Sequence, residues 1–120
     1  MGDLSTNFWK KEFMCHCGCG VYKANARLLA LLEDIRAHFG RPVKITSGYR
    51  CEAHNKAIKG AKDSQHTKGT AADIQVQDTE PMVVYQYCLK ILDHAGGCGV
   101  YKSWVHIDVR PGPEARWDER

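Results

Sequence analysis

The sequence predicts a single α+β domain in which a small antiparallel sheet packs against helices on one side. Two segments carry apolar residues at helical spacing, and the segments between and after them are short and strand-like. The length of 120 residues suits one domain, and 43% hydrophobic and 26% charged residues are ordinary for a globular protein. The order helix, strand, loop, strand, helix and hairpin is typical of the α+β class.

The first helix is expected from Ala26 to Phe39, where apolar residues recur every three or four positions. Asn25 is a typical N-cap residue, and Gly40, which precedes Arg41-Pro42, is a typical C-cap residue. The next segment, Val43 to Thr46, is partly β-branched and predicts a short strand.

The middle of the chain is expected to hold a short helix, a surface loop and a strand. The helix is expected over Glu52 to Ile58, and the loop over Gly60 to Gly69, which is polar and rich in small residues. Thr70 to Val76 alternates in polarity and predicts the strand. This alternation turns Asp73 away from Ile74 and the core, towards a cleft.

A second helix and a hairpin complete the predicted domain. Pro81 suits the first turn of the helix, and Gly96-Gly97 is expected to close it. The two hairpin strands are expected over Cys98 to Tyr101 and Trp104 to Val109.

The last predicted strand carries polar side chains on one face only. His106 and Asp108 alternate with Val105, Ile107 and Val109. Since the apolar set faces the core, His106 and Asp108 are expected on the open face, where Asp73 also lies.

Two histidines and one carboxylate are therefore candidates for a metal site. His66, Asp73 and His106 could bind one Zn²⁺ ion through two imidazole nitrogens and a carboxylate oxygen. Three protein ligands leave a fourth position for water, which is typical of a catalytic zinc site.

The residues around this set form a wider pattern. It includes Ser47-Gly48-Tyr49-Arg50, His54-Asn55, Ser64-x-His66-x-x-Gly69-x-Ala71-x-Asp73 and His106-Ile107-Asp108-Val109-Arg110. The pattern resembles the zinc D-Ala-D-Ala carboxypeptidase family of peptidases, and within it the small single-domain branch that includes phage endolysins.

The resemblance implies a fold, an activity and a set of site residues. The fold would be the zinc D-Ala-D-Ala carboxypeptidase or hedgehog-like α+β domain. His66, Asp73 and His106 would be the zinc ligands, and Arg50 would bind substrate near the metal. The domain would cover residues 13–110, after a loosely held lead-in (residues 1–12) and before an irregular tail (residues 111–120).

Four further roles are expected from the chemistry of single residues. Arg50 can bind a substrate carboxylate with its planar guanidinium, or form a surface ion pair. Asp108 can orient a histidine ligand or pair with Arg110 or Arg50. Ser64 can place the substrate or cap the loop, and Trp104 can form a wall of the cleft or fill a strand face.

The residue that takes up the proton during hydrolysis is not evident. Many members of the family place an acid or a histidine two or three residues before the last ligand, where this chain has Ser103 and Trp104. The candidate substitutes are Asp108, His54, Glu52 and His16.

The six cysteines are unusual for this length. Cys15, Cys17 and Cys19 are crowded, whereas Cys51, Cys88 and Cys98 are dispersed. An extended segment would spread the first three too far apart to share one ion, but Gly18 and Gly20 allow a turn that gathers them. Free thiols near a tight turn, a second zinc site and, after export, disulfides are the alternatives.

The sequence therefore predicts a monomeric zinc-dependent peptidase that acts on peptidoglycan stem peptides as a D-Ala-D-Ala carboxypeptidase or an L-Ala-D-Glu endopeptidase. The alternative is a non-catalytic wall-binding or morphogenetic module that retains a structural zinc. The net charge of +3 without a basic cluster argues against nucleic-acid binding, and no apolar run is long enough to insert into a membrane. Met1 to Lys11 lacks the apolar core of a signal peptide, so synthesis in the cytoplasm and phage-like release to the cell wall are expected.

Overall fold

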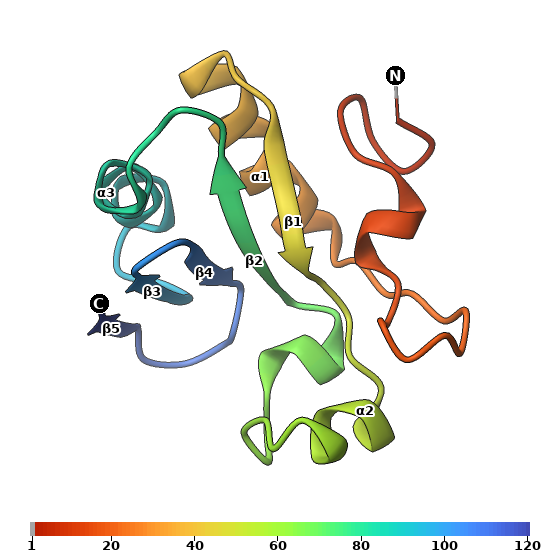
Figure 1. Ribbon diagram of the computed structural model, residues 1–120. Coiled ribbons are helices and arrows are strands. Elements are labelled where there is room, and N and C mark those ends of the chain that lie inside the picture. Colours follow the sequence, from red (N-terminus) through yellow and green to blue (C-terminus); the bar gives the residue numbers. More distant parts are fainter. Residues whose placement is uncertain (1) are drawn as a thin grey trace.

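The computed structural model describes residues 2–120 (Figure 1). Its elements in chain order are η1 (Lys10–Phe13), α1 (Ala26–Phe39), β1 (Val43–Ser47), α2 (Glu52–Ala57), η2 (Gln65–Lys68), β2 (Ala71–Val76), α3 (Pro81–Leu92), β3 (Gly97–Tyr101), β4 (Val105–Asp108) and β5 (Ala115–Glu119). The predicted α+β class is confirmed, and the predicted helices and strands up to β4 form within a few residues of their expected bounds.

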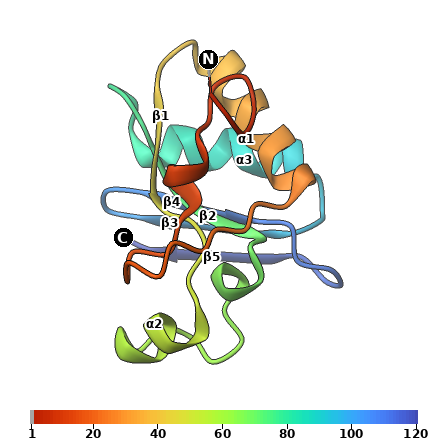
Figure 2. The ribbon, with the colours of Figure 1, turned by 90° about the vertical axis from the view of Figure 1, so that its right-hand side faces the viewer.

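The five strands form one sheet in the order β1-β2-β4-β3-β5. All neighbours are antiparallel except β3 and β5, which are parallel. Figure 2 shows α1 and α3 together on one side of the sheet, with the short α2 lying apart from them. The two long helices therefore cover one face, and the other face is left for a site.

Local sequence determines the ends of α1. The Asn25 side chain accepts hydrogen bonds from the backbone N–H groups of Arg27 (2.8 Å) and Leu28 (3.2 Å), as expected of an N-cap. Gly40 ends the helix with φ 62°, a left-handed conformation that glycine adopts without strain.

The core lies between the two long helices and the sheet. Ile74 of β2 and Ile107 of β4 are fully buried there, together with Val100 of β3. They pack with residues of α1 and α3 that share the same burial, namely Leu28, Leu32, Ile35, Val84, Cys88 and Leu92. The odd-even alternation of β2 and β4 therefore leaves Asp73 and His106 on the opposite face.

The register of β2 against β4 matters most for the site. Asp73 lies directly opposite His106, and Ala71 lies opposite Asp108. Directly opposed residues of antiparallel strands have Cβ atoms about 4.5–5.5 Å apart, so their side chains meet.

The expected irregular tail at residues 111–120 is wrong, because Ala115–Glu119 forms β5 along the free edge of β3. Its sequence, Ala-Arg-Trp-Asp-Glu, alternates in polarity over only four residues and has no β-branched residue, so the strand signal is weak. The pairing instead depends on an unpaired edge that only the folded sheet provides.

The expectation of a loosely held lead-in also differs from the structure. Phe8 is buried in the core, and the Glu33 carboxylate of α1 accepts hydrogen bonds from Ser5 Oγ (2.7 Å) and Asn7 Nδ2 (2.6 Å). These contacts dock the first residues against α1.

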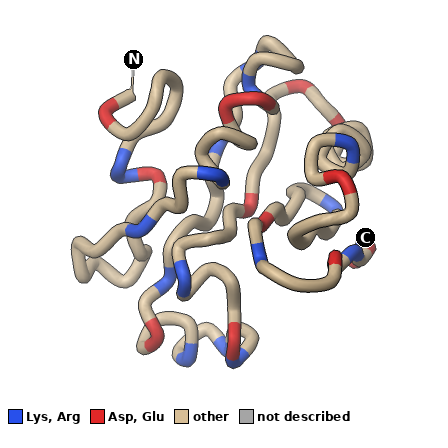
Figure 3. The backbone as a smooth tube through the Cα atoms, turned by 180° about the vertical axis from the view of Figure 1, so that it is seen from behind, with Lys and Arg blue, Asp and Glu red and all other residues tan. Residues whose placement is uncertain are grey.

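Charged residues of both signs are interspersed along the chain (Figure 3). The weak net charge of +3 is therefore spread over the fold. Among residues 2–120, no helix combines the length and the apolar character needed to cross a membrane.

Candidate metal centre and cleft

Three side chains from separate elements converge on the uncovered face of the sheet. His66 comes from η2, Asp73 from β2 and His106 from β4, and one ligand atom of each lies within 4.8 Å of the others. Asp73 Oδ1 is 3.4 Å from His66 Nε2 and 3.1 Å from His106 Nδ1. The structure thus brings together the three residues that the sequence suggested as metal ligands, hereafter the triad.

His66 is positioned by the turn that carries it. Ser64 Oγ accepts a hydrogen bond from the His66 backbone N–H (3.2 Å), and Gly69 closes the turn with φ 72°. The His66 side chain is only 3% exposed, although the surrounding loop was expected at the surface.

The imidazole of His66 is oriented by a backbone carbonyl. Its Nδ1 lies 2.7 Å from the Gly48 oxygen, which can only accept a hydrogen bond. Nδ1 therefore carries the proton, and Nε2 presents its lone pair to the triad. Gly48 must be glycine here, because a Cβ atom would lie 2.8 Å from Phe13 Cα.

The imidazole of His106 is oriented by Asp108 in the same way. His106 Nε2 donates to Asp108 Oδ2 over 2.7 Å, which leaves Nδ1 facing Asp73. Asp108 is fully buried and also accepts from Arg110, over 2.9 Å from Nε and 2.7 Å from Nη2. Asp108 therefore orients the histidine and pairs with Arg110 at once.

The electrostatics of the triad favour an ionised carboxylate. Burial acts to raise the pKa of Asp73. With no metal bound, the ring nitrogens of His106 and His66 that face Asp73 can carry a second proton and donate it, and this outweighs burial and holds the pKa of Asp73 well below its usual range. Burial acts to lower the pKa of His106, whereas Asp108 and Asp73 raise it, and the net pKa is raised. The triad is a negatively charged group flanked by two imidazoles, which attracts a cation.

The donor set fits a zinc ion. Two imidazole nitrogens and one carboxylate oxygen are ligands that Zn²⁺ takes in catalytic sites with three protein ligands. Each imidazole has its second nitrogen held by an acceptor, as is usual for histidines bound to a metal.

The triad opens into a cleft of about 410 Å³. Arg50, Ser64 and Trp104, the three predicted substrate-binding residues, all line it. The lining also includes residues that sequence reasoning missed, namely Asp63, Tyr101, Arg110 and Trp117.

Arg50 reaches the cleft with part of its guanidinium unsatisfied. Its Nη1 donates to Asn55 Oδ1 over 3.1 Å. Its Nε is buried and, within the described part of the chain, has no hydrogen-bond partner. Burial lowers the pKa of Arg50, and the negative charge of Asp73 offsets only part of this effect. An arginine nevertheless stays protonated at neutral pH. A half-buried cation with a free N–H is suited to bind a substrate anion.

Trp117 forms a wall that could not be expected without β5. Its ring centroid is 5.1 Å from that of His106, and its Nε1 donates to the Tyr101 hydroxyl over 2.8 Å. The indole lies where a side chain of residue 99 would be, since a Cβ atom on Gly99 would lie 2.1 Å from Trp117 Nε1. The glycine in β3 is thus the one sequence signal that could have suggested a close neighbour on this strand.

The candidates for proton uptake need correction. Of the described residues, none of Glu52, His54 and His16 lines the cleft. Asp108 does not line the cleft either, and both of its carboxylate oxygens accept hydrogen bonds, from His106 and from Arg110. The predicted catalytic role of Asp108 is therefore replaced by a role in positioning His106. Asp63 is the one carboxylate outside the triad among the described residues that line the cleft.

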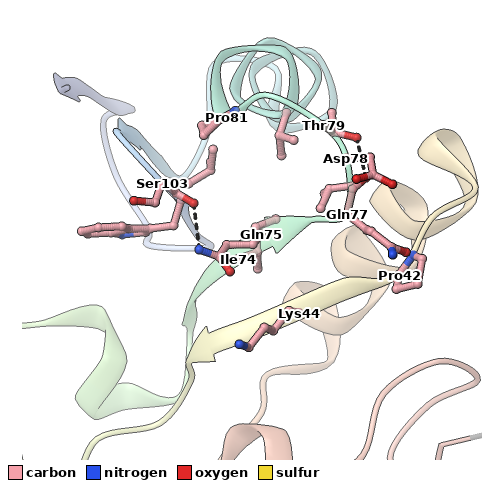
Figure 4. Close-up of a pocket in the computed structure, with 13 residues that line it drawn as sticks. Pro42, Lys44, Ile74, Gln75, Gln77, Asp78, Thr79, Pro81 and Ser103 are labelled. Carbon is pink, nitrogen blue, oxygen red and sulfur yellow. Dashed lines mark hydrogen bonds between the residues drawn. The ribbon is translucent and has the colours of Figure 1, made fainter.

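A second hollow lies between β2, the first turn of α3 and the β3–β4 turn (Figure 4). Figure 4 shows Gln75 reaching the backbone oxygen of Ser103, a hydrogen bond of 3.0 Å. Trp104 lines both this hollow and the cleft, so it separates them. Asp78 is the only carboxylate among the described residues of its lining, so the hollow lacks the groups for metal chemistry.

Comparisons with known proteins agree with this geometry. The model of the family Peptidase M15 matches residues 6–108. The peptidoglycan L,D-endopeptidase MepK of Escherichia coli K12 is 34% identical in an alignment 84 residues long, which covers 64% of this chain and 44% of the relative. The protein of that name from Shigella flexneri matches with the same identity and coverage. The chain thus spans less than half the length of the curated relatives it matches.

Proposed function

The chain belongs to the peptidase M15 family, and from this membership we propose that it is a zinc-dependent peptidase that hydrolyses peptide bonds of peptidoglycan. The observation that carries the proposal is the triad, whose two histidines are each oriented by an acceptor and which opens into a cleft that Arg50 also lines. The relatives named as peptidoglycan endopeptidases support the substrate class.

The residues of the triad have separate parts in this proposal. His66 Nε2, Asp73 Oδ1 and His106 Nδ1 would hold the ion. When bound, zinc polarises the carbonyl group of the scissile bond and lowers the pKa of a water molecule so that it can attack. Gly48 and Asp108 keep the proton on the far nitrogen of each imidazole, so both ligand nitrogens stay free to coordinate.

Arg50 anchors the substrate. A carboxylate that accepts from Arg50 Nε would satisfy the buried N–H that has no partner among residues 2–120. Peptidoglycan peptides carry carboxylates on side chains and at their ends, which matches this cation. Trp104, stacked on Tyr101 with ring centroids 4.4 Å apart, and Trp117 form the walls that hold the peptide and exclude water.

We place the cleaved bond inside the peptide, between an L- and a D-configured residue, and not at a terminal D-Ala. The support is the L,D-endopeptidase name of the relatives. The L-Ala-D-Glu bond of the stem is one such bond. Action at the cell wall after release from the producing cell stays a prediction.

The test is mass spectrometry of purified muropeptides after incubation with zinc-loaded protein. Tetrapeptide stems, cross-linked dimers and pentapeptide stems form three arms. All three contain the bonds within the stem, the dimers add the cross-link bond, and the pentapeptides add the terminal D-Ala-D-Ala bond. We expect cleavage within a stem or a cross-link, abolished in His66→Ala and kept in His94→Ala, since His94 is 89% exposed and does not line the cleft.

Each outcome has one meaning. Release of only a terminal D-Ala would make the protein a carboxypeptidase and overturn the endopeptidase assignment. If no arm gives a product although one zinc ion is bound to the triad, the peptidase proposal is wrong and the alternative, a non-catalytic wall-binding module, is favoured.

A further inference from the structure

Four cysteines form a second cluster, outside the triad. Cys15, Cys17 and Cys19 lie on the loop after η1, and Cys51 immediately precedes α2. Their sulfur atoms all lie within 4.8 Å of one another. The Cys15 sulfur is 3.4 Å from that of Cys17 and 3.6 Å from that of Cys51, and the Cys17 and Cys51 sulfurs are 3.6 Å apart.

The loop is folded back on itself, which brings alternate cysteines together. Met14 pairs with Tyr22 in an antiparallel bridge, and the Cys15 N–H donates to the Val21 oxygen over 3.0 Å. Gly18 and Gly20 have φ values of 88° and 78°, which a residue with a side chain rarely adopts. The glycine turn considered in the sequence is therefore present.

We propose that Cys15, Cys17, Cys19 and Cys51 bind a structural zinc ion. In a tetrahedral site with Zn–S distances of about 2.3 Å the sulfurs are about 3.8 Å apart, close to the three separations given above. A disulfide needs about 2.05 Å, so the sulfurs are arranged around a common centre and not as bonded pairs.

Two backbone groups also point at the sulfurs. The Cys51 N–H donates to Cys15 Sγ over 3.3 Å, and the His54 N–H donates to Cys51 Sγ over 3.4 Å. Such N–H groups offset part of the negative charge that thiolates carry when they bind a metal. Four thiolates fill a tetrahedral ion completely and leave no position for water, so the site is structural.

The position of the cluster suggests what the ion would support. Cys51 directly follows Arg50, and the Tyr49 N–H donates to the Phe13 oxygen over 3.2 Å. The ion would connect the loop after η1 to the segment that carries Gly48 and Arg50. In that segment, the Gly48 oxygen orients His66, and Arg50 lines the cleft. The two metal sites share no residue, so this proposal does not depend on peptidase activity.

The experiment uses the full chain with the triad disabled by His66→Ala and His106→Ala. After reduction, the protein is loaded with zinc and gel-filtered, its zinc is counted by elemental mass spectrometry, and the zinc surroundings are measured by X-ray absorption. We expect one zinc per chain with four sulfur neighbours at about 2.3 Å.

Adding Cys17→Ser and Cys19→Ser to this protein should remove the ion. Both side chains are exposed, so these changes disturb the core little. Cys88→Ala and Cys98→Ala, which change the two buried cysteines outside the cluster, should keep one zinc per chain.

A measurement on the unaltered chain avoids any folding defect of the variants. Cobalt bound by cysteine gives an intense thiolate-to-metal absorption band, which the triad cannot produce because it has no sulfur. We expect this band in reduced wild-type protein loaded with Co²⁺. Its absence, or a reduced triad variant that is folded but binds no zinc, would overturn the proposal, whatever the outcome with muropeptides.

Discussion

Asp108 shows how much one buried carboxylate can determine at the residue scale. It is the acceptor that fixes the proton on His106 Nε2, and Arg110 in turn holds it from two directions. The nitrogen offered to the metal is thus chosen by a residue that does not line the cleft.

Asp108→Asn should weaken zinc binding at the triad by roughly 10- to 100-fold, because the amide is a poorer acceptor for the His106 N–H and leaves the Arg110 charge unpaired. Competition with a chelator, measured with the cysteine site already occupied, gives the affinity. Asp118→Asn is the matched control, since Asp118 pairs with Arg120 in the same Asp-x-Arg geometry but contacts no histidine in the described structure. Equal zinc affinity in the two variants would contradict this role for Asp108.

Asp63 is the residue to test for proton uptake. If it accepts the proton from the attacking water, Asp63→Asn should lower kcat by roughly 10²- to 10⁴-fold and leave the zinc content unchanged. Steady-state hydrolysis of the cleaved muropeptide gives the value, and Asp78→Asn, in the second hollow, serves as the control. An Asp63→Asn enzyme with wild-type kcat would place the proton acceptor elsewhere.

At the scale of elements, structure that depends on local signals could be predicted from the sequence, whereas structure that depends on long-range strand pairing could not. The bounds of α1 followed from an N-cap asparagine, a C-terminal glycine and helical apolar spacing, all within one segment. β5 could not be predicted in this way, because Ala115–Glu119 becomes a strand only when the β3 edge is available.

The same distinction applies to the residues of the candidate site: those placed by local alternation were predicted, and those placed by long-range contacts were missed. Alternation within β2 and β4 placed Asp73 and His106 on one face, and their register then made them direct neighbours. Trp117 and Cys51 were missed because nothing in their own segments points to their partners. Cys51 lies 36 residues from Cys15, and only the folded chain brings the two sulfurs together.

The contact between α1 and α3 gives a prediction on alkaline stability. A hydrogen bond from the Tyr87 hydroxyl to Asp34, with burial, raises the pKa of Tyr87 to about 12. An unfolded tyrosine ionises near pH 10. Between these values the unfolded chain loses a proton that the folded chain keeps, so this contribution is complete below pH 10 and is lost as the pH rises through about 12.

Tyr87→Phe should therefore destabilise the protein by about 1 kcal/mol at neutral pH, the usual value for one hydrogen bond. The difference from wild type should shrink between about pH 10 and 12. Urea unfolding across this range measures it, with Tyr22→Phe, at an exposed position away from α3, as the control. A difference that stays constant with pH would show that the Asp34 contact does not govern the ionisation of Tyr87.

At the scale of the whole molecule, two clusters of possible metal ligands lie at either end of one short segment. Gly48 contacts His66 of the triad, and Cys51, three residues later, joins the cysteine cluster. The stability of the fold should therefore depend on metal through both sites.

Removal of zinc should lower the melting temperature in wild type and, to a smaller extent, in the His66→Ala/His106→Ala protein. Each site stabilises the fold by about 2.7 kcal/mol when free zinc exceeds the dissociation constant 100-fold. Calorimetry with and without chelator measures the loss. Further addition of Cys17→Ser and Cys19→Ser should make the melting temperature insensitive to the chelator, and a remaining shift would point to zinc bound elsewhere.

The pairing of Asp73 with His106 across β2 and β4 also bears on how the sheet assembles. Side chains alternate between the faces of a strand, so a slip of one residue would turn one of these two ligands towards the helices. An ion held by both therefore stabilises the native alignment over each slipped one. In a growing or refolding chain, metal would act as a selector of strand alignment before it takes any part in hydrolysis.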